Sequence, residues 1–254
     1  MTNISRTILM AVASMALVIS YSVHARSDGV AVGGAYHYSS DIYKDTDSHN
    51  EGFPLISYRG EHVYFQGVEL GVGLMPLDAP HNILWQVTYD GRHFDPDDSD
   101  NAAMQGLNER HATGLTGPEL RYSLPVGQLA VKAALEFTNE HHGYLLDASW
   151  LYSYRFQGAT GLTTQIGYQY NSSKMSNYLY GVSESESAQT GITSYDVGGS
   201  GSWYAALGGF AELTSSIRLF AGAKLTYFDK DIYDSPIVTH EVTHSLNVGV
   251  AYRF

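Results

Sequence analysis

The last nine residues, LNVGVAYRF from Leu246 to Phe254, alternate between two kinds of side chain. Every second residue is apolar or aromatic, and the residues between them are small or polar. Because successive side chains of a strand point to opposite faces, this pattern predicts a strand with one apolar and one polar face. In a soluble protein the apolar face meets the core, whereas in an outer-membrane barrel it meets lipid and the polar face lines the lumen. The rest of the chain decides between these two classes.

The amino-terminal residues predict an export signal. Arg6 is basic, residues 8–20 form an apolar run, and Val23-His24-Ala25 has the small-x-small pattern of a cleavage site. The run is too short for a membrane-spanning helix, which needs about 20 apolar residues. We expect residues 1–25 to be removed as a signal peptide, leaving residues 26–254 as one outer-membrane domain.

Charge and cysteine content exclude several classes of protein. Of 14 Lys and Arg residues only Arg6 lies in the predicted signal, which leaves 13 basic against 26 acidic residues, a net charge of −13. So acidic a protein is a poor binder of phosphate backbones, and we expect no nucleic-acid partner. The chain has no cysteine, so a disulfide framework is excluded. No other apolar run approaches the length of a membrane helix, so a membrane-spanning form must be a closed barrel.

Two-residue alternation recurs clearly through the second half of the chain. These strands are about 9 to 13 residues long, against ~5–6 in globular sheets and ~9–11 for a strand that crosses a membrane. Weaker strand patterns precede them at residues 30–38, 54–59, 62–74 and 83–90. The clear segments are residues 119–124, 129–137, 144–156, 162–171, 203–213, 217–227 and 246–254.

The connections alternate between short turns and long acidic loops. Short turns are expected at residues 125–127, 157–161 and 215–216. Outer-membrane barrels have short periplasmic turns and long external loops, whereas a soluble sandwich has no reason to separate the two by end. We therefore predict a transmembrane antiparallel up-and-down β-barrel in the outer membrane. Long loops are expected at residues 39–52, 91–117, 172–201 and 229–240.

The number of strands follows from parity. The patterns give eleven segments if residues 62–74 form one strand, but both ends of such a barrel belong in the periplasm, so the number must be even. A break near Gly67 gives twelve strands, which we predict. Ten would result if residues 30–38 lay outside the wall.

Two motifs resemble metal sites. His240-Glu-Val-Thr-His244 matches H-E-x-x-H, which needs a helix to bring both histidines to one zinc ion. In a strand these residues are about 13 Å apart, which is too far for one ion. The acidic run from Asp95 to Asp100 lacks the glycine and distal glutamate of an EF-hand loop. We predict no catalytic residue, no metal site and no cofactor.

Ten charged residues fall on the faces expected to line the lumen. Six are basic and four acidic, and mixed charges in a confined space usually pair. We expect a narrow, internally braced barrel, with a small-solute pore as the alternative. The ten residues are Glu119, Arg121, Lys132, Glu136, Asp147, Arg155, Glu212, Arg218, Lys224 and Arg253.

Three segments carry a resemblance to the MipA/OmpV family of outer-membrane proteins. They are Tyr178-Leu-Tyr-Gly-Val182 with Ala188, Gly191 and Tyr195, then Asp234-Ser-Pro-Ile-Val238, and the closing Tyr252-Arg-Phe254. The resemblance is strongest over the last part of the chain and looser around residues 56–65. Leu179 stands where the family usually has a second tyrosine.

The resemblance implies a non-enzymatic barrel that contacts outer-membrane lipid and lipopolysaccharide. It also implies a scaffold in peptidoglycan biosynthesis, with a lytic transglycosylase and a murein synthase as partners. A small-solute channel and an adhesin acting through the acidic loops remain the alternatives. Tyr252 and Phe254 resemble the signal that the barrel assembly machinery recognises, and we expect removal of Phe254 to impair membrane insertion.

Overall fold

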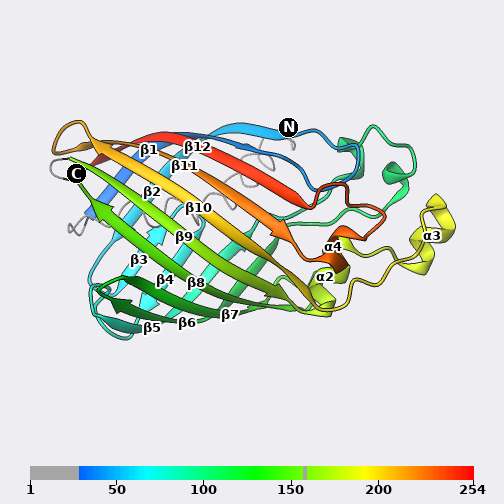
Figure 1. Ribbon diagram of the computed structural model, residues 1–254, viewed down its shortest axis with the longest axis horizontal. Coiled ribbons are helices and arrows are strands. Elements are labelled where there is room, and N and C mark those ends of the chain that lie inside the picture. The colour runs from blue at the N-terminus through cyan, green and yellow to red at the C-terminus, as the bar shows by residue number, and fades with distance from the viewer. Residues whose placement is uncertain (1–28, 157–158) are drawn as a thin grey trace.

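Within the described residues, 29–156 and 159–254 of a computed structural model, twelve antiparallel strands close into one barrel (Figure 1). Each strand pairs with its neighbours in sequence, and β1 closes the wall against β12. This confirms the predicted barrel, and the break near Gly67 gives the predicted twelve strands. The predicted signal peptide, residues 1–25, lies outside the described residues.

The strands differ widely in length. Two near the amino terminus, β3 and β4, are much shorter than the rest, and this difference matters below. The strands are β1 Gly29–Ser39, β2 His49–Arg59, β3 Val63–Gln66, β4 Glu69–Gly73, β5 His81–Asp90, β6 Thr113–Leu124, β7 Gly127–Glu136, β8 Tyr144–Arg155, β9 Thr160–Asn171, β10 Ser200–Glu212, β11 Ile217–Phe228 and β12 Val242–Arg253.

The carboxy-terminal strand has the two faces that its sequence predicts. Leu246 and Val248 are 51% and 55% exposed on the outside, whereas Asn247 between them is buried in the interior. The register with β1 runs from Ala31 opposite Arg253 to Ser39 opposite Ser245. Beyond the strand, the Phe254 amide donates to the carbonyl of Val30 at 3.1 Å, so the end of the chain is tied to the first strand.

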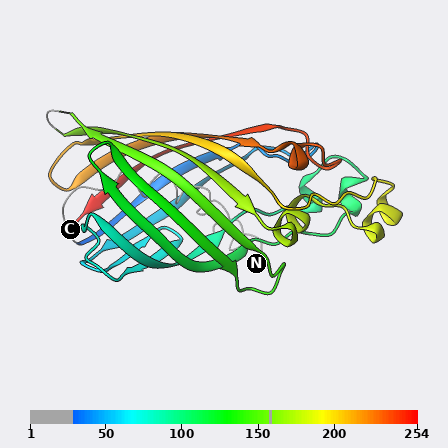
Figure 2. The ribbon, with the colours of Figure 1, turned by 60° about the horizontal axis from the view of Figure 1, so that its bottom comes forward.

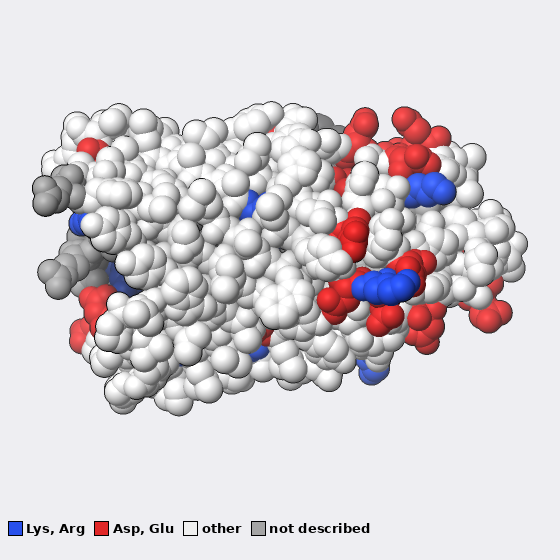
Figure 3. Space-filling model, viewed as in Figure 1, with Lys and Arg blue, Asp and Glu red and all other residues white. Residues whose placement is uncertain are grey.

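The outer surface carries a broad band with few charges (Figure 3). Trp85 and Trp203 are both 58% exposed in this band, and Tyr122 and Tyr154 are exposed with them. Aromatic rings of this kind favour the boundary between hydrocarbon and water. Acidic side chains gather instead at one end of the molecule, over the long connections. This distribution fits a barrel whose middle meets lipid and whose acidic end meets water.

The long connections lie together at one end, which we call the loop end (Figure 2). The carboxy terminus and most short connections lie at the opposite turn end, which is periplasmic in barrels of this type. At the loop end the chain folds into short helices, which are η1 Pro96–Asp98, η2 Met104–Gly106, α2 Ser173–Tyr180, α3 Glu184–Thr190 and α4 Lys230–Tyr233.

These connections enclose an apolar core of their own, which we call the loop cap. The Tyr43 hydroxyl donates to the carbonyl of Leu179 at 2.9 Å, and the Ser235 hydroxyl donates to that of Tyr180 at 2.6 Å. Ile237, two residues after Ser235, is completely buried. Phe94, Met104, Met175 and Ile232 pack into the same cluster. Segments far apart in sequence therefore form one compact layer over the mouth of the barrel.

All four predicted loops were partly wrong, and the one at residues 229–240 contains α4. β2 begins at His49, inside the loop predicted for residues 39–52, because its register with β1 continues past the regular alternation to the pair Ser39 and His49. β6 likewise begins at Thr113, inside the loop predicted for residues 91–117. The loop predicted for residues 172–201 contains α2 and α3. In each case contacts with neighbouring segments order a stretch whose own pattern is weak.

The H-E-x-x-H motif adopts no helix. It runs from an irregular segment at His240 into β12, which begins at Val242. The extended backbone separates its two histidines as expected for a strand. Among the residues that the structure describes, no helix is long and apolar enough to cross a membrane.

Candidate functional site

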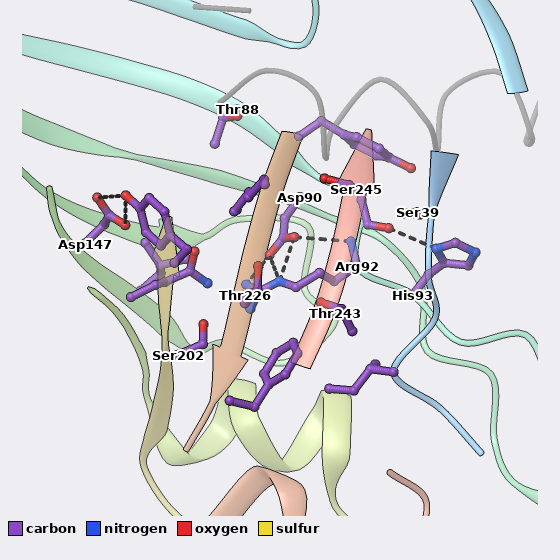
Figure 4. Close-up of a pocket in the computed structure, with 18 of the residues that line it drawn as sticks. Ser39, Thr88, Asp90, Arg92, His93, Asp147, Ser202, Thr226, Thr243 and Ser245 are labelled. Atoms are coloured by element: carbon purple, nitrogen blue, oxygen red, sulfur yellow. Dashed lines mark hydrogen bonds and ion pairs between the residues drawn. The ribbon is translucent and has the colours of Figure 1, made fainter. Parts of the chain in front are cut away.

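A polar cavity of about 590 Å³ lies inside the loop-end half of the barrel (Figure 4). Tyr43 and Tyr180 of the loop cap border it on one side, and charged side chains of the wall strands border it on the other. Five of the ten predicted lumen residues line it. These are Glu119, Arg121, Lys132, Asp147 and Lys224.

A connected set of polar side chains lies on the lumen side of five neighbouring strands beside this cavity, and we call it the wall group. Gln86 donates to Glu119 at 2.6 Å and to the Tyr64 hydroxyl at 2.8 Å. Tyr64 in turn donates to Glu69 at 2.5 Å, and Glu69 lies 3.6 Å from Lys132. Arg121 pairs with Glu119 and stacks on the Tyr64 ring. The wall group therefore ties β3, β4, β5, β6 and β7 together along their inner face.

Asp147 and Lys224 contribute to a second contact further round the wall, on β8, β10 and β11. The Tyr204 hydroxyl donates to Asp147 at 3.0 Å, and the Lys224 ammonium lies 4.7 Å from the centre of the same ring. Figure 4 shows Asp147 on the side of the cavity away from Asp90 and Arg92. Carboxylate and ammonium therefore share one aromatic partner.

A third group lies at the turn end. Glu212 accepts from Arg155 at 2.8 Å and from Arg218 at 2.5 Å. Both guanidinium groups also lie over the Phe210 ring, at 5.4 and 4.6 Å from its centre. Arg253, on the neighbouring strand, donates to the carbonyl of Ser215 at 2.8 Å. Arg155 and Arg218, which lie far apart in sequence, therefore share the carboxylate of Glu212 in one charged cluster.

Glu136 serves a different purpose from the other predicted lumen residues. It ends β7, and its carboxylate accepts from the backbone amide of His142 at 2.8 Å and from the Thr138 hydroxyl at 2.6 Å. Its hydrogen bonds therefore hold the β7–β8 connection rather than cross the lumen.

A buried ion pair joins two connections within the loop cap. Arg110 lies 2.7 Å from Glu186 of α3, and both side chains are at most 6% exposed. Burial alone would raise the pKa of Glu186. Hydrogen bonds from Ser183, the Arg110 charge and the Asn108 amide outweigh burial and lower that pKa below its ordinary value. The glutamate is therefore held in its charged form.

Several of these residues escaped the sequence analysis. Tyr64 and Glu69 stand on short strands, so alternation did not reveal the face they occupy, and Gln86 is uncharged, so it was not among the charged residues assigned to the lumen. His49, His93 and Asp98 also come close together at the loop end. Among these residues, only α3 has a recognisable helix signal in the sequence. Ser183 and Glu186 have the spacing of a capping box, and Gly191 follows the helix.

The arrangement is one of paired charges rather than of a nucleophile beside a base. The predicted lumen residues fall into the wall group, the contact at Tyr204, the cluster around Glu212 and the connections at either end. Charges paired in this way brace a wall, and the cavity between them has room for a small polar solute.

Comparison with known proteins finds a matching family model and similar outer-membrane proteins. The family model described as MltA-interacting protein MipA matches residues 32–254. The MltA-interacting protein of Escherichia coli strain K12 is 30% identical over 226 residues, which cover 89% of each chain. The outer membrane protein OmpV of Vibrio cholerae is 25% identical over 219 residues, covering 85% of this chain and 83% of that one.

Solved structures support the architecture. The translocator domain of the autotransporter NalP from Neisseria meningitidis superposes with a TM-score of 0.54 at 12% identity. The match covers 95% of this chain and 94% of that one. Sequence identity this low shows a shared fold alone.

Proposed function

Because the chain belongs to the MipA family of MltA-interacting proteins and is an outer-membrane β-barrel, we propose that it acts as a non-enzymatic scaffold. Its partner would be a lytic transglycosylase of the MltA type, brought to the outer membrane for murein synthesis. The observation that carries this proposal is a rigid surface at the turn end, built on the β4–β5 connection, residues 74–80.

That connection has the properties of a docking surface. The Asn82 side chain is buried beneath it, accepts from the Met75 amide at 3.0 Å and donates to the carbonyls of Met75 and Pro76. The backbone amide of Leu77 donates to the backbone carbonyl of Glu61 at 2.7 Å, which joins the connection to the neighbouring turn. Leu74 is nevertheless 74% exposed. A fixed backbone that presents apolar side chains favours association, because little conformational entropy is lost on binding.

Capture of a purified MltA-type transglycosylase on the folded barrel in detergent tests the proposal. We expect Leu74→Asn to lower the amount captured at least fivefold, because it replaces the most exposed large apolar side chain of the surface. Leu213→Asn is the matched control, since Leu213 is 60% exposed at the separate β10–β11 connection. Failure of the unmodified barrel to capture the enzyme at low salt, or equal losses in both variants, would contradict the proposal.

A small-solute channel is the second candidate, and the cavity of about 590 Å³ is the observation that favours it. The loop cap above this cavity and the Glu212 cluster below it both weigh against free passage. Conductance across a planar bilayer distinguishes the two candidates, because a scaffold needs no open lumen.

A further inference from the structure

In the loop-end half of the wall, the short strands β3 and β4 do not extend between β2 and β5. β3 and β4 turn back early, so the last residue of β3, Gln66, pairs with Ser57. The first residue of β4, Glu69, pairs with Thr88, near the end of β5. β2 continues from Ser57 to His49, and within the described residues no strand pairs with it there on the β5 side. Two segments separated by two strands at the turn end can therefore meet directly at the loop end.

They meet at a cluster of two histidines and an aspartate. One ring nitrogen of His49, one of His93 and a carboxylate oxygen of Asp98 lie within 4.8 Å of one another. His49 begins β2, His93 follows β5, and Asp98 ends η1. The two imidazole rings are 5.5 Å apart between centres. Figure 4 shows His93 on the same side of the cavity as Arg92 and Ser39.

Hydrogen bonds fix which nitrogen of each imidazole is free to bind a ligand. Nε2 of His49 lies 2.8 Å from a carboxylate oxygen of Asp41, and Nδ1 of His93 lies 2.9 Å from the carbonyl oxygen of Gly91. Both oxygens can only accept, so both ring nitrogens donate. In the neutral rings a lone pair then remains on Nδ1 of His49 and on Nε2 of His93. Metal-binding histidines almost always hold their second nitrogen in this way.

We propose that His49, His93 and Asp98 bind a divalent transition-metal ion of the zinc type, which ties β2 to the connection after β5 across the short β3–β4 hairpin. Two imidazoles and one carboxylate are a donor set that zinc accepts, with water completing the shell. Calcium and magnesium prefer an all-oxygen shell, so they fit this set poorly.

Geometry and charge both favour the ion. Ligands about 2.1 Å from a tetrahedral zinc ion lie about 3.4 Å apart, so the cluster must contract by at most about 1.4 Å. Asp98 is exposed and on a connection, where side-chain rotation supplies that distance. Asp41 and Asp95 lie close enough to act electrostatically on Asp98, and Glu51 acts on His49. A cation at this position relieves their mutual repulsion.

Zinc titration of the untagged full chain, folded in detergent micelles, tests the site by calorimetry. We expect one ion per barrel, with affinity reduced at least tenfold in His49→Ala and in His93→Ala. Asp41→Asn is expected to weaken binding about tenfold, because loss of an outer-shell partner typically costs 10–100-fold in affinity. Calcium is expected to leave the zinc titration unchanged.

The control variant carries both His240→Ala and His244→Ala. These histidines are exposed and belong to the H-E-x-x-H motif, so they can bind adventitious zinc without belonging to the cluster. We expect this double variant to keep the affinity of the unmodified chain. Heat-dependent mobility on gels verifies that each variant is folded.

Binding of Co²⁺ provides an independent test of the coordination geometry at the cluster. Co²⁺ bound to two imidazoles and a carboxylate in a tetrahedral site absorbs visible light far more strongly, and at longer wavelength, than the octahedral aqua ion, and we expect His93→Ala to abolish this strong absorption. The proposal is overturned if the unmodified chain binds no zinc. It is equally overturned if His93→Ala binds as the unmodified chain does, or if only the His240 and His244 variant loses affinity.

Discussion

At the scale of single residues, Glu212 shows how the interior charges act. Its carboxylate accepts from two arginines that approach from different strands, and its side chain is 21% exposed. Two guanidinium groups on one aromatic ring repel each other unless an anion lies between them. The carboxylate therefore supplies both hydrogen-bond acceptance and charge compensation.

Glu212→Gln removes the charge while it keeps the shape of the side chain. We expect the free energy of unfolding to fall by about 2 kcal/mol, the usual contribution of hydrogen bonds to charged groups. Urea unfolding in detergent micelles measures the change. Glu184→Gln removes an exposed carboxylate from α3 and serves as the control, with an expected change within about 0.5 kcal/mol. Equal effects of the two substitutions would show that the cluster adds no stability.

The Arg110–Glu186 pair gives the loop cap a defined dependence on pH. The folded pKa of Glu186 lies below its ordinary value of 4.5, so the folded cap binds its proton less readily than the unfolded chain does. The stabilisation from Glu186 is therefore complete above pH 4.5 and is lost as the pH falls through the folded pKa. Hydrogen exchange of the α3 amides should show the cap loosening over this acidic window. Glu186→Gln should remove this dependence, and an unchanged pH profile in that variant would contradict the assignment.

At the scale of elements, the strands from β6 onward could be predicted from the sequence, because each is long enough to repeat its two faces several times. β3 and β4 are four and five residues long, so neither repeats a pattern enough to be recognised alone. Parity, not alternation, indicated the break between them. The two short strands also carry Tyr64 and Glu69, which explains why these two of the six wall-group residues were missed.

The seam between β1 and β12 depends on close approach of two backbones at Gly33. A Cβ atom at this position would lie 2.0 Å from the carbonyl oxygen of Val250, whereas at Gly34 the nearest atom, the carbonyl oxygen of Phe53, would lie 3.9 Å away. We expect Gly33→Ala to lower the free energy of unfolding by about 1–3 kcal/mol, because the seam must shift to admit a methyl group. Gly34→Ala is the matched control in the same strand. If the two variants unfolded at the same temperature, this steric explanation would be excluded.

At the scale of the whole molecule, the interior could be predicted only in part. Alternation placed six basic and four acidic residues on the inner face, but it could not pair them, because pairing depends on register between strands. The loop cap was also beyond the sequence patterns. Its apolar core draws single residues such as Tyr43, Phe94 and Ile237 from separate connections, and none of these segments has a periodic face.

The wall group and the loop cap together make a specific prediction about permeability. The unmodified barrel should show no sustained conductance steps in a planar bilayer, because the cap covers the cavity and the charged side chains of Glu119, Arg121 and Lys132 occupy the lumen beneath it. Replacing these three residues with alanine removes the charged side chains but keeps the outward face of every strand. Truncating the α2–α3 segment of the cap in the same chain then removes the cover.

The chain with both changes should conduct more than either single change, since the cap covers the cavity and the charged side chains narrow the lumen beneath it. A barrel with the outward substitutions Leu120→Val and Val131→Leu controls for insertion, because both residues are 54% exposed to the membrane side. Conductance in the unmodified barrel would favour the channel over the scaffold. Absence of conductance in the barrel with both changes would instead place the barrier at the turn end, where Glu212 holds Arg155 and Arg218 together.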